Sequence, residues 1–399
     1  MDRILSIKTT KQAKVFLKSI NVSSQGVNAM VPKMFQEVIL LKNISIGAAN
    51  ILKQEMLIIG ADAAMSHGIV EGEISNSDII LIGERSKFKK LKNRLKNYQK
   101  FEFPSILKRI IKLVETFQSE YEFEIELSGK KLILKPTLLM GILNITPDSF
   151  SDGGDFLKVE DAVKQVEKMI SEGVDIIDIG GESTRPGAQE IGVEDEIRRI
   201  IPVIEAIRKK FQIPISIDTT KAIVAEKAIQ IGANIINDIS ALSFDERMVG
   251  VLQKNERIPV ILMHMKGTPQ SMQKEPFYDD VIQEICDFFD ERIKFCIESG
   301  IEKERIIIDP GIGFGKRQED NLKILQRLKE FHSLGVPVLL GASRKSFINK
   351  IYESQPFERL SGSLATTALS FENNIQVVRV HDVKPHKQLI KTLKAIKEI

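Results

Sequence analysis

The sequence predicts an α/β protein: a (β/α)8 TIM barrel over residues 135–399, preceded by a smaller α/β extension over residues 1–130. Two observations predict the barrel. From Leu138 onward, apolar runs rich in Ile and Val alternate with amphipathic helical segments, and such runs are typical of parallel strands buried on both faces. Eight runs in about 260 residues, each followed by a helix, match the usual size of this barrel and favour it over an open doubly wound sheet.

The predicted strands and helices follow one another in a regular order. The strands are LLMGILNI, VDIIDIGG, IPISIDT, NIINDIS, IPVILMHM, RIIIDPG, VPVLLGAS and VVRVHDV. Several of the helices between them end at glycine, which is a common stop signal. The helices include VEDAVKQVEKMISEG, VEDEIRRIIPVIEAIRKK, KAIVAEKAIQIG, YDDVIQEICDFFDERIKFCIESG, QEDNLKILQRLKEF and KPHKQLIKTLKAIKEI.

The extension lacks this regularity and carries no recognisable catalytic pattern. The stretches MLIIGADAAM and SDIILIGERSKFKKLKNRLKNYQKF indicate short α/β units. YEFEIELSGKKLILK indicates a hairpin around Ser128 and Gly129 that leads into the barrel. The basic run from Lys87 to Lys100 could contact nucleic acid, but a solvated helix face is the preferred interpretation. We expect the extension to be a structural or oligomerising module.

Composition and charge exclude several classes of partner. The 57 Lys and Arg residues nearly balance the 54 Asp and Glu residues, for a net charge of +3, so no nucleic-acid or membrane partner is expected. The sequence shows no signal-peptide core and no apolar run near the roughly 18 residues that span a bilayer. Cys286 and Cys296 have neither metal-site nor disulfide spacing. We therefore expect a cytoplasmic protein whose partners are small molecules.

Polar residues follow nearly every predicted strand. In this barrel the active site lies at the C-terminal ends of the strands. One carboxylate at a strand end can simply cap the next helix, but capping does not explain a whole set that converges on one rim. The set comprises Asn144 and Thr146, Asp178 and Glu182–Arg185, Asp218, Asn237 and Asp238, His264, Asp309, Ser343–Ser346, and Arg379, His381 and Asp382.

One part of this set predicts a slot for a flat heterocycle. Asp218, Asn237 and Asp309 supply acceptors and one amide, which suits a ring whose amidine-like edge presents two adjacent donors to a carboxylate. Lys345 could donate to the opposite edge of that ring. Together the four residues predict a site for a pterin or a guanine.

The other part predicts an anion site at the mouth of the pocket. Arg379 and His381, with Asn144 and Thr184 on neighbouring loops, supply donors near a helix start that often seats phosphate in such barrels. We expect a diphosphate there, with a hard cation such as Mg²⁺ held through oxygens that include the Asn144 side chain. Asn144 could instead be only a turn residue before a proline.

The stretch DPGIGFGK, residues 309–316, resembles a phosphate-binding loop only superficially. It lacks the Lys-Ser/Thr ending of a true P-loop. Its glycines are predicted to turn the backbone sharply out of the strand, or to let it pass close to a ligand.

Seven motifs resemble those of the dihydropteroate synthase family, and they run in order from about Leu138 to the C-terminus. They are GILNITPDSFSDGG, DIIDIGGESTRPGA, SIDTTKAIVAEKAI, GANIINDIS, IIIDPGIGFGK, GASRKSF and RVHDV. The resemblance implies a transferase of folate biosynthesis. In its reaction 4-aminobenzoate displaces diphosphate from (7,8-dihydropterin-6-yl)methyl diphosphate, forming a C–N bond and giving 7,8-dihydropteroate.

The resemblance also implies roles for single residues, and a homodimer packed through barrel helices. Arg185, Lys345 and Ser346 would lie on the 4-aminobenzoate side, where sulfonamides compete. The pterin would be bound by Asp218, Asn237, Asp309 and Lys345, the diphosphate by Thr184, Arg379 and His381, and Mg²⁺ by Asn144. The residues expected to act in catalysis are Asp218, Asp309, Lys345, Arg379 and His381.

The mechanism expected from these charges is an SN1-like substitution. An aryl amine is already neutral at about pH 7, so the nucleophile needs no strong base. Mg²⁺, Arg379 and His381 would neutralise the leaving diphosphate, while Asp218 and Asp309 favour positive charge on the pterin methylene. Two alternatives remain at this stage. One is a methyltetrahydrofolate-to-corrinoid methyltransferase of the same barrel class, and the other is a barrel that has lost catalysis and serves as a scaffold.

Overall fold

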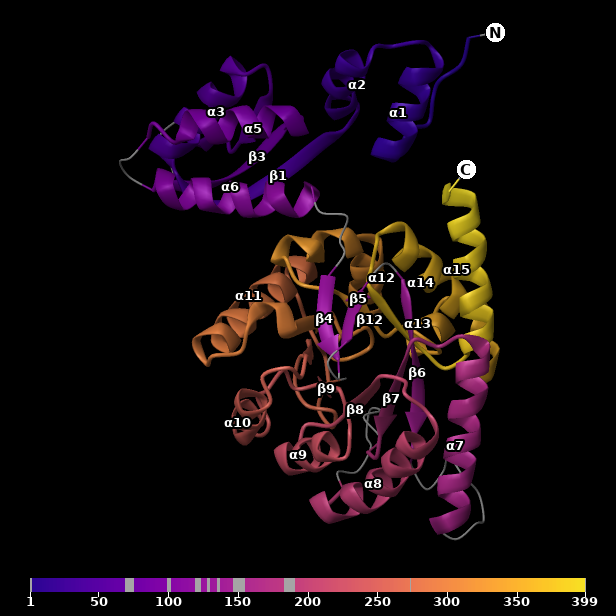
Figure 1. The fold of residues 1–399 in the computed structure, drawn as a ribbon. Coiled ribbons are helices and arrows are strands. Elements are labelled where there is room, and N and C mark those ends of the chain that lie inside the picture. The colour runs from indigo at the N-terminus through magenta and orange to yellow at the C-terminus, as the bar shows by residue number, and fades with distance from the viewer. Residues whose placement is uncertain are drawn as a thin grey trace. The chain divides into compact units, whose positions relative to one another are not determined.

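The computed structural model describes residues 2–68, 75–98, 102–118, 123–127, 130–134, 137–145, 155–182, 191–272 and 274–398 (Figure 1). The chain divides into two compact units, Met1–Glu120 and Tyr121–Ile399. Among the described residues, no helix is long and apolar enough to cross a membrane.

The first unit is built on a three-stranded antiparallel sheet of order β1-β3-β2. Along β1, Ile39 and Leu41 are buried in the core, whereas Val38 and Leu40 are 62% and 47% exposed, as expected where one face of a sheet is covered and the other is open. The mixture of helices and strands confirms the predicted α/β extension. Its elements are α1 (Thr10–Ser19), α2 (Ser24–Met30), η1 (Val31–Met34), β1 (Gln36–Ser45), α3 (Ile46–Ile58), β2 (Asp62–Met65), β3 (Asn76–Glu84), α5 (Arg85–Leu95) and α6 (Phe103–Gln118).

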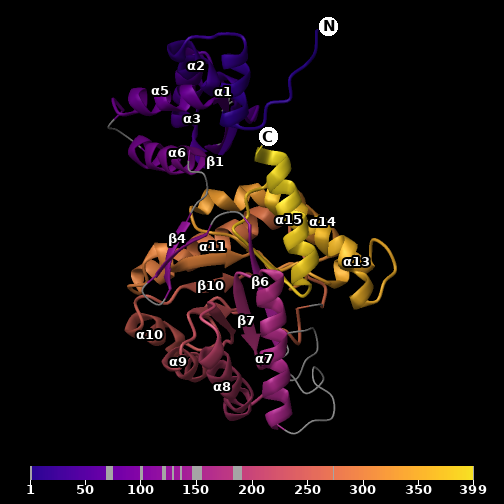
Figure 2. The ribbon, with the colours of Figure 1, turned by 45° about the vertical axis from the view of Figure 1, so that its right-hand side comes forward.

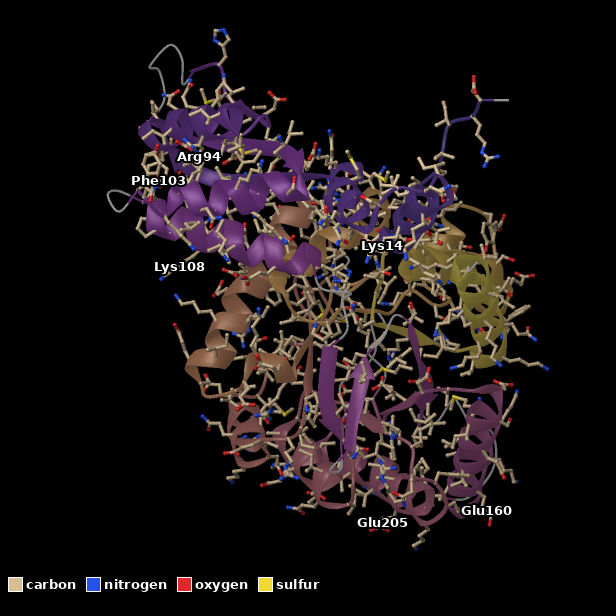
Figure 3. The ribbon with its side chains drawn as sticks, turned by 45° about the horizontal axis from the view of Figure 1, so that its top comes forward. Lys14, Arg94, Phe103, Lys108, Glu160 and Glu205 are labelled. Carbon is tan, nitrogen blue, oxygen red and sulfur yellow. The ribbon has the colours of Figure 1, made fainter. Side chains whose placement is uncertain are left out.

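The predicted basic run falls largely on α5, which is amphipathic. Phe88, Leu91 and Leu95 are buried beneath it, whereas Lys89 and Lys90 are exposed to solvent. Arg94, labelled in Figure 3, bonds through Nε and Nη2 to the buried carboxylate of Glu55. The Tyr98 hydroxyl donates to the same carboxylate at 2.7 Å. The helix is thus attached to the rest of its unit by both apolar and ionic contacts.

The second unit confirms the predicted barrel. Eight parallel strands pair in the order β11-β10-β9-β8-β7-β6-β13-β12, and a parallel bridge between Ile308 and Val338 joins the two ends of this order. All eight apolar runs predicted to be strands contain one of them. The strands are β6 (Leu138–Asn144), β7 (Ile176–Gly180), β8 (Ile215–Asp218), β9 (Ile235–Asp238), β10 (Val260–Met263), β11 (Ile306–Asp309), β12 (Leu339–Leu340) and β13 (Val377–Val380).

Helices surround the barrel, and Figure 2 shows α7, α8 and α9 along one side of it. Helix α8 coincides with its predicted segment; three acidic residues occupy its first turn and three basic residues its last, which complements the helix dipole. The helices are α7 (Asp155–Glu172), α8 (Val193–Lys210), α9 (Ala222–Gln230), α10 (Arg247–Lys254), α11 (Val281–Glu298), α12 (Gln318–Gln326), α13 (Ser346–Asn349), α14 (Leu360–Glu372) and α15 (Val383–Glu398), with 3-10 turns η3 (Lys303–Arg305), η4 (Leu328–Leu334) and η5 (Pro356–Glu358).

The predicted hairpin is present as β4 (Phe123–Leu127) and β5 (Lys130–Leu134), paired antiparallel. Its turn residues, Ser128 and Gly129, lie outside the described residues. The hairpin groups with the barrel in the second unit, whereas the extension was predicted to reach residue 130. Leu134 packs into an apolar cluster with one inward residue from each of seven barrel strands: Met140, Ile176, Ile235, Ile261, Ile307, Leu339 and Val377. This cluster fills the N-terminal end of the barrel, so the C-terminal end is where a site can form.

Candidate active site

The polar side chains of the site occupy the layer of the barrel interior directly above this apolar cluster. Side chains alternate along a strand, so a residue two positions beyond an inward apolar residue also faces the interior. Asp178 stands in this relation to Ile176, and Asp309 to Ile307. Asn237 and Arg379 follow the same rule after Ile235 and Val377. The strand period thus brings four predicted polar residues to one level.

Arg379, on β13, bonds to carboxylates on two other strands, β7 and β8. Its Nε donates to Asp178 Oδ2 at 2.6 Å, and its Nη2 donates to Asp218 Oδ2 at 2.9 Å. Asn237 Nδ2 also donates to Asp178 Oδ2, at 3.2 Å. Asp178 is fully buried and Asp218 is 8% exposed, so this guanidinium is the cation that allows two carboxylates to sit side by side away from water.

Asn144 lies at the same level, close to Asp218. In the sheet register Asn144 pairs with Gly180, and Gly180 pairs with Asp218. A Cβ placed on Gly180 would be 3.8 Å from both Asn144 Oδ1 and Asp218 Oδ2. The glycine therefore keeps open the space into which these two oxygens point.

Asp309, the last residue of β11, and Lys345, which directly precedes α13, form a second group. A Cβ placed on Gly341 would lie 3.4 Å from Asp309 Oδ2 and 3.9 Å from Lys345 Nζ, so both side chains converge on the same point. The other oxygen of Asp309 accepts the backbone N–H of Gly311 at 2.8 Å. Lys345 Nζ donates to the Ile312 carbonyl and lies 4.4 Å from the centre of the Phe314 ring.

Burial shifts the pKa values of the ionisable groups in this pocket in the direction that favours their neutral forms. Desolvation raises the pKa of Asp218 to about 7 despite the opposing charge of Arg379. It also raises the pKa of Asp309, against the attraction of Lys345. The pKa of Lys345 falls to about 8 because burial outweighs the stabilising charge of Asp309. Perturbed acids and bases gathered in one pocket are a mark of functional sites.

The remaining predicted residues lie around this pocket or outside the described part of the chain. His381 directly follows β13, two residues after Arg379, and its Nδ1 is 3.0 Å from Ser343 Oγ. Ser346 is exposed at the start of α13. Thr146, Thr184 and Arg185 lie outside the described residues.

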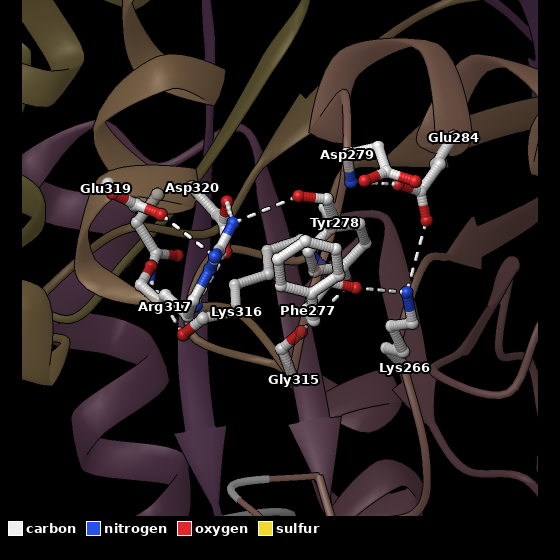
Figure 4. A network of polar contacts seen from close by, with 11 residues as sticks. Lys266, Phe277, Tyr278, Asp279, Glu284, Gly315, Lys316, Arg317, Glu319 and Asp320 are labelled. Carbon is white, nitrogen blue, oxygen red and sulfur yellow. Dashed lines mark hydrogen bonds and ion pairs between the residues drawn. The ribbon is translucent and has the colours of Figure 1, made fainter. Parts of the chain in front are cut away.

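The loop after β11 is held against the loop after β10, and Figure 4 shows part of the network that links them. The Tyr278 hydroxyl donates to the Gly315 carbonyl at 2.8 Å. Gly311 and Gly315 have positive φ angles, and a Cβ on either would come within 2.3 Å of a backbone oxygen of the β10 loop. The glycines of DPGIGFGK therefore let two loops approach each other, one of which carries the Phe314 ring against Lys345.

Lys316 ends this segment as a buried structural lysine. Its Nζ is 2.9 Å from His264 Nδ1 and donates to the carbonyls of His264 and Phe314 at 3.2 and 3.0 Å. Burial lowers the pKa values of both Lys316 and His264. His264, predicted as a member of the polar rim, thus serves to anchor a loop.

A separate ionic cluster supports the loop after β7. Lys221 Nζ donates to Glu182 and, at 2.7 Å, to Glu196 Oε2. Glu182 Oε1 accepts the backbone N–H of Ile191 at 3.4 Å. Glu196 is 1% exposed, and its Oε1 is buried without a hydrogen-bond partner in the described part of the chain.

Removing Lys221 is expected to destabilise the barrel. In Lys221→Met, two carboxylates would remain buried or half-buried without a cation, and breaking such a pair typically costs about 3 kcal/mol or more. Denaturant unfolding of the full chain measures this. Lys164→Met serves as the control, because Lys164 and its partner Asp161 are 71% and 50% exposed. Equal stability of the two variants would show that the Lys221 cluster contributes nothing.

Sequence reasoning placed Asp178 at the rim but gave it no role in the site. In the structure Asp178 is bonded to both Arg379 and Asn237. The available signal was an Asp two residues after an Ile within a strand otherwise made of apolar residues and glycine. Ser343 was likewise named only as part of a loop.

Comparisons by sequence and by structure find similar known proteins. Residues 140–381 match the family model described as pterin binding enzyme. The chain is 47% identical to the dihydropteroate synthase of Escherichia coli (strain K12) over 267 residues, which are 67% of this chain and 94% of that protein. A solved structure of the Xanthomonas albilineans dihydropteroate synthase with 4-aminobenzoic acid is 41% identical, with a TM-score of 0.66, and covers 70% of this chain and 99% of that one. A structure from the same organism in complex with 7,8-dihydropteroate is 39% identical, with a TM-score of 0.63, and covers 69% and 99%.

Proposed function

Because the chain belongs to the dihydropteroate synthase family of pterin-binding enzymes, we propose that it joins (7,8-dihydropterin-6-yl)methyl diphosphate to 4-aminobenzoate. The products are 7,8-dihydropteroate and diphosphate. The observation that carries this proposal is the buried polar layer of the barrel, in which Arg379 bridges Asp178 and Asp218 while Asp309 and Lys345 face the same interior. The relatives named above are dihydropteroate synthases, which favours this reaction over methyl transfer to a corrinoid.

The pterin ring is proposed to lie between the two charged groups of the pocket. The carboxylate of Asp309 accepts from the donors on the amidine-like edge of the ring, and Asn237 and Asp218 complete that wall. Lys345 donates to the opposite edge. When Asp218 is ionised, above its pKa of about 7, the carboxylates of the pocket outnumber its cations, and the pocket favours positive charge that develops on a bound ring. The carboxylates are those of Asp178, Asp218 and Asp309, and the cations are Arg379 and Lys345.

The diphosphate is proposed to sit above this layer, beside His381 and Asn144, with Thr184 on the neighbouring loop. The described residues contain no cluster of three or more His, Cys, Asp or Glu side chains placed to hold a metal ion. Mg²⁺ suits such a site, because it commonly takes only one or two protein oxygens together with substrate phosphates. Asn144 Oδ1, near Asp218 Oδ2, fits as the protein oxygen. When bound, the ion would supply positive charge to the leaving diphosphate.

The reaction proceeds by cleavage of the C–O bond before the C–N bond is complete. The electron pair of the C–O bond leaves with the diphosphate, which His381 stabilises by donating a hydrogen bond. Among the described residues, Arg379 Nη1 donates to no protein acceptor, so it too can reach a substrate oxygen. The lone pair of the 4-aminobenzoate nitrogen then forms the C–N bond, and one N–H proton passes to solvent. Arg185, Lys345 and Ser346 are proposed to orient the aminobenzoate.

We also propose that the enzyme acts in the cytoplasm as a homodimer packed through barrel helices. The extension, which carries no recognisable catalytic pattern, is proposed to be a structural or oligomerising module.

The pH dependence of kcat/KM for the pterin diphosphate is expected to be bell-shaped, with its maximum between about pH 7 and 8. As the pH rises through the pKa of Asp218, about 7, its carboxylate becomes ionised and can accept charge-assisted hydrogen bonds. Above the pKa of Lys345, about 8, the ammonium is lost and the rate falls. In Lys345→Arg the alkaline limb is expected to move upward, because arginine keeps its charge. An alkaline limb at the same pH in both enzymes would exclude Lys345 as its origin.

The proposed function is tested by product analysis. Purified protein is incubated with the pterin diphosphate, 4-aminobenzoate and Mg²⁺, and 7,8-dihydropteroate is detected by mass spectrometry. We expect product that is reduced by a sulfonamide in competition with 4-aminobenzoate, and reduced by EDTA until Mg²⁺ is restored. Protein that binds a reduced pterin but forms no dihydropteroate would refute the proposal.

A further inference from the structure

We infer that Ser343 holds His381 in the tautomer that carries its proton on Nε2, which makes Ser343 a positioning residue for the imidazole at the diphosphate site. The functional half of this inference rests on the proposed role of His381. The assignment of the tautomer is argued from the hydrogen bonds that join the two residues.

The two residues meet at the C-terminal ends of neighbouring strands. Ser343 follows β12 and is 6% exposed, and His381 follows β13. Ser343 Oγ lies 3.3 Å from the backbone nitrogen of His381 and 3.0 Å from its Nδ1. One hydroxyl thus contacts both the main chain and the ring of the same histidine.

The direction of these bonds follows from the donors and acceptors available. The backbone N–H can only donate, so Ser343 Oγ accepts from it. The hydroxyl proton then needs an acceptor, and among the described residues His381 Nδ1 is the acceptor in reach. If Nδ1 carried a proton, two N–H groups would point at one oxygen, and a buried hydroxyl hydrogen would have no acceptor, which is unfavourable. Ser343 therefore donates to Nδ1, and a neutral ring keeps its proton on Nε2.

This tautomer gives the ring the polarity that an anion site requires. An Nε2–H group donates to a phosphate oxygen, whereas the other tautomer would present a lone pair and repel it. His381 stands two residues after Arg379, whose guanidinium bonds to Asp178 inside the barrel. Ser343 thus acts on the substrate only through the ring that it orients.

The first test reads the tautomer directly, without substrate. Nitrogen-15 spectra of the histidine rings are recorded for the full chain at about pH 8, and His381 is assigned by the signals lost in His381→Gln. His386 serves as an internal reference for a neutral, hydrogen-bonded histidine ring. It is fully buried, its Nδ1 is 2.8 Å from Thr367 Oγ, and burial lowers its pKa to about 4. We expect an unprotonated Nδ1 and a protonated Nε2 in wild type, a mixture of tautomers in Ser343→Ala, and the wild-type pattern again in Ser343→Thr, which keeps a hydroxyl. A protonated Nδ1 in wild type, or an unchanged tautomer in Ser343→Ala, would overturn the inference.

The second test asks whether Ser343 acts only by orienting His381 or whether its loss weakens the binding of every ligand. In Ser343→Ala the KM for the pterin diphosphate is expected to rise about fivefold, as for loss of one hydrogen bond, and Ser343→Thr should restore it. The KM for 4-aminobenzoate and the Kd for 6-hydroxymethyl-7,8-dihydropterin, which has no diphosphate, should stay unchanged. Equal weakening of all three would overturn the positioning role. Wild-type protein without turnover would refute the proposed function instead, and the spectra would still decide the tautomer.

Discussion

Arg379→Met is expected to lower kcat/KM by about a thousandfold and to destabilise the barrel by about 3–5 kcal/mol. The reason is electrostatic. Asp178 and Asp218 are both buried, and Arg379 forms an ion pair with each of them. Without the guanidinium, one or both carboxylates must take up a proton or draw water into the pocket. Steady-state kinetics and denaturant unfolding of the same preparation measure the two effects.

The matched control for Arg379→Met is Arg198→Met. Arg198 also pairs with an aspartate, but the two side chains are 71% and 54% exposed, and exposed pairs contribute little. No measurable change in stability or rate is expected there. If Arg379→Met retained wild-type stability and turnover, the bridge between Asp178 and Asp218 would not be what organises the pocket.

Asp309→Asn is expected to lower pterin affinity about a hundredfold, and turnover at least as much, while leaving the fold intact. The asparagine Oδ1 can still accept the Gly311 N–H that the aspartate accepts at 2.8 Å. What is lost is a carboxylate able to receive two adjacent donors from the ring, and each such charge-assisted bond is worth about 1.5–3 kcal/mol. Calorimetric titration with a reduced pterin and thermal unfolding measure the two quantities.

Asp238→Asn provides the contrasting control on a neighbouring strand. Asp238 is also fully buried, and burial raises its pKa to about 6, but it accepts from Ser240 and Leu242 of its own loop. In the variant, the NH2 group of the asparagine would face one of these donors, so about 1–3 kcal/mol of stability should be lost. The folded molecules should still bind pterin with normal affinity. Similar losses of pterin affinity in both variants would contradict the assignment of Asp309 to the ring.

The apolar runs and the polar residues at their ends were sufficient to predict the barrel strands and several residues of the pocket. Every predicted barrel strand is present, because an apolar run buried on both faces has few other structures open to it. Asp218, Asn237 and Asp309 were placed at the pocket for the same reason: they end such runs.

The parts that sequence reasoning did not supply depend on register and on contacts between distant segments. Asp178 belongs to the pocket because its strand aligns it with Arg379, which lies 201 residues further along the chain. Arg379 was predicted only as an anion ligand, and its bonds to two carboxylates could not be read from spacing. The role of the hairpin depends on Leu134 meeting residues of seven strands at one end of the barrel, a contact that no local pattern encodes.

We propose that these strand ends form one pocket for a pterin whose diphosphate leaves. The most direct test is a diphosphate-release assay on the purified full chain with the pterin diphosphate and Mg²⁺, with and without 4-aminobenzoate, beside Asp309→Ala. Release that requires both substrates and collapses in the variant is the predicted result. Release at the same rate without 4-aminobenzoate, or a variant as fast as wild type, would contradict the claim.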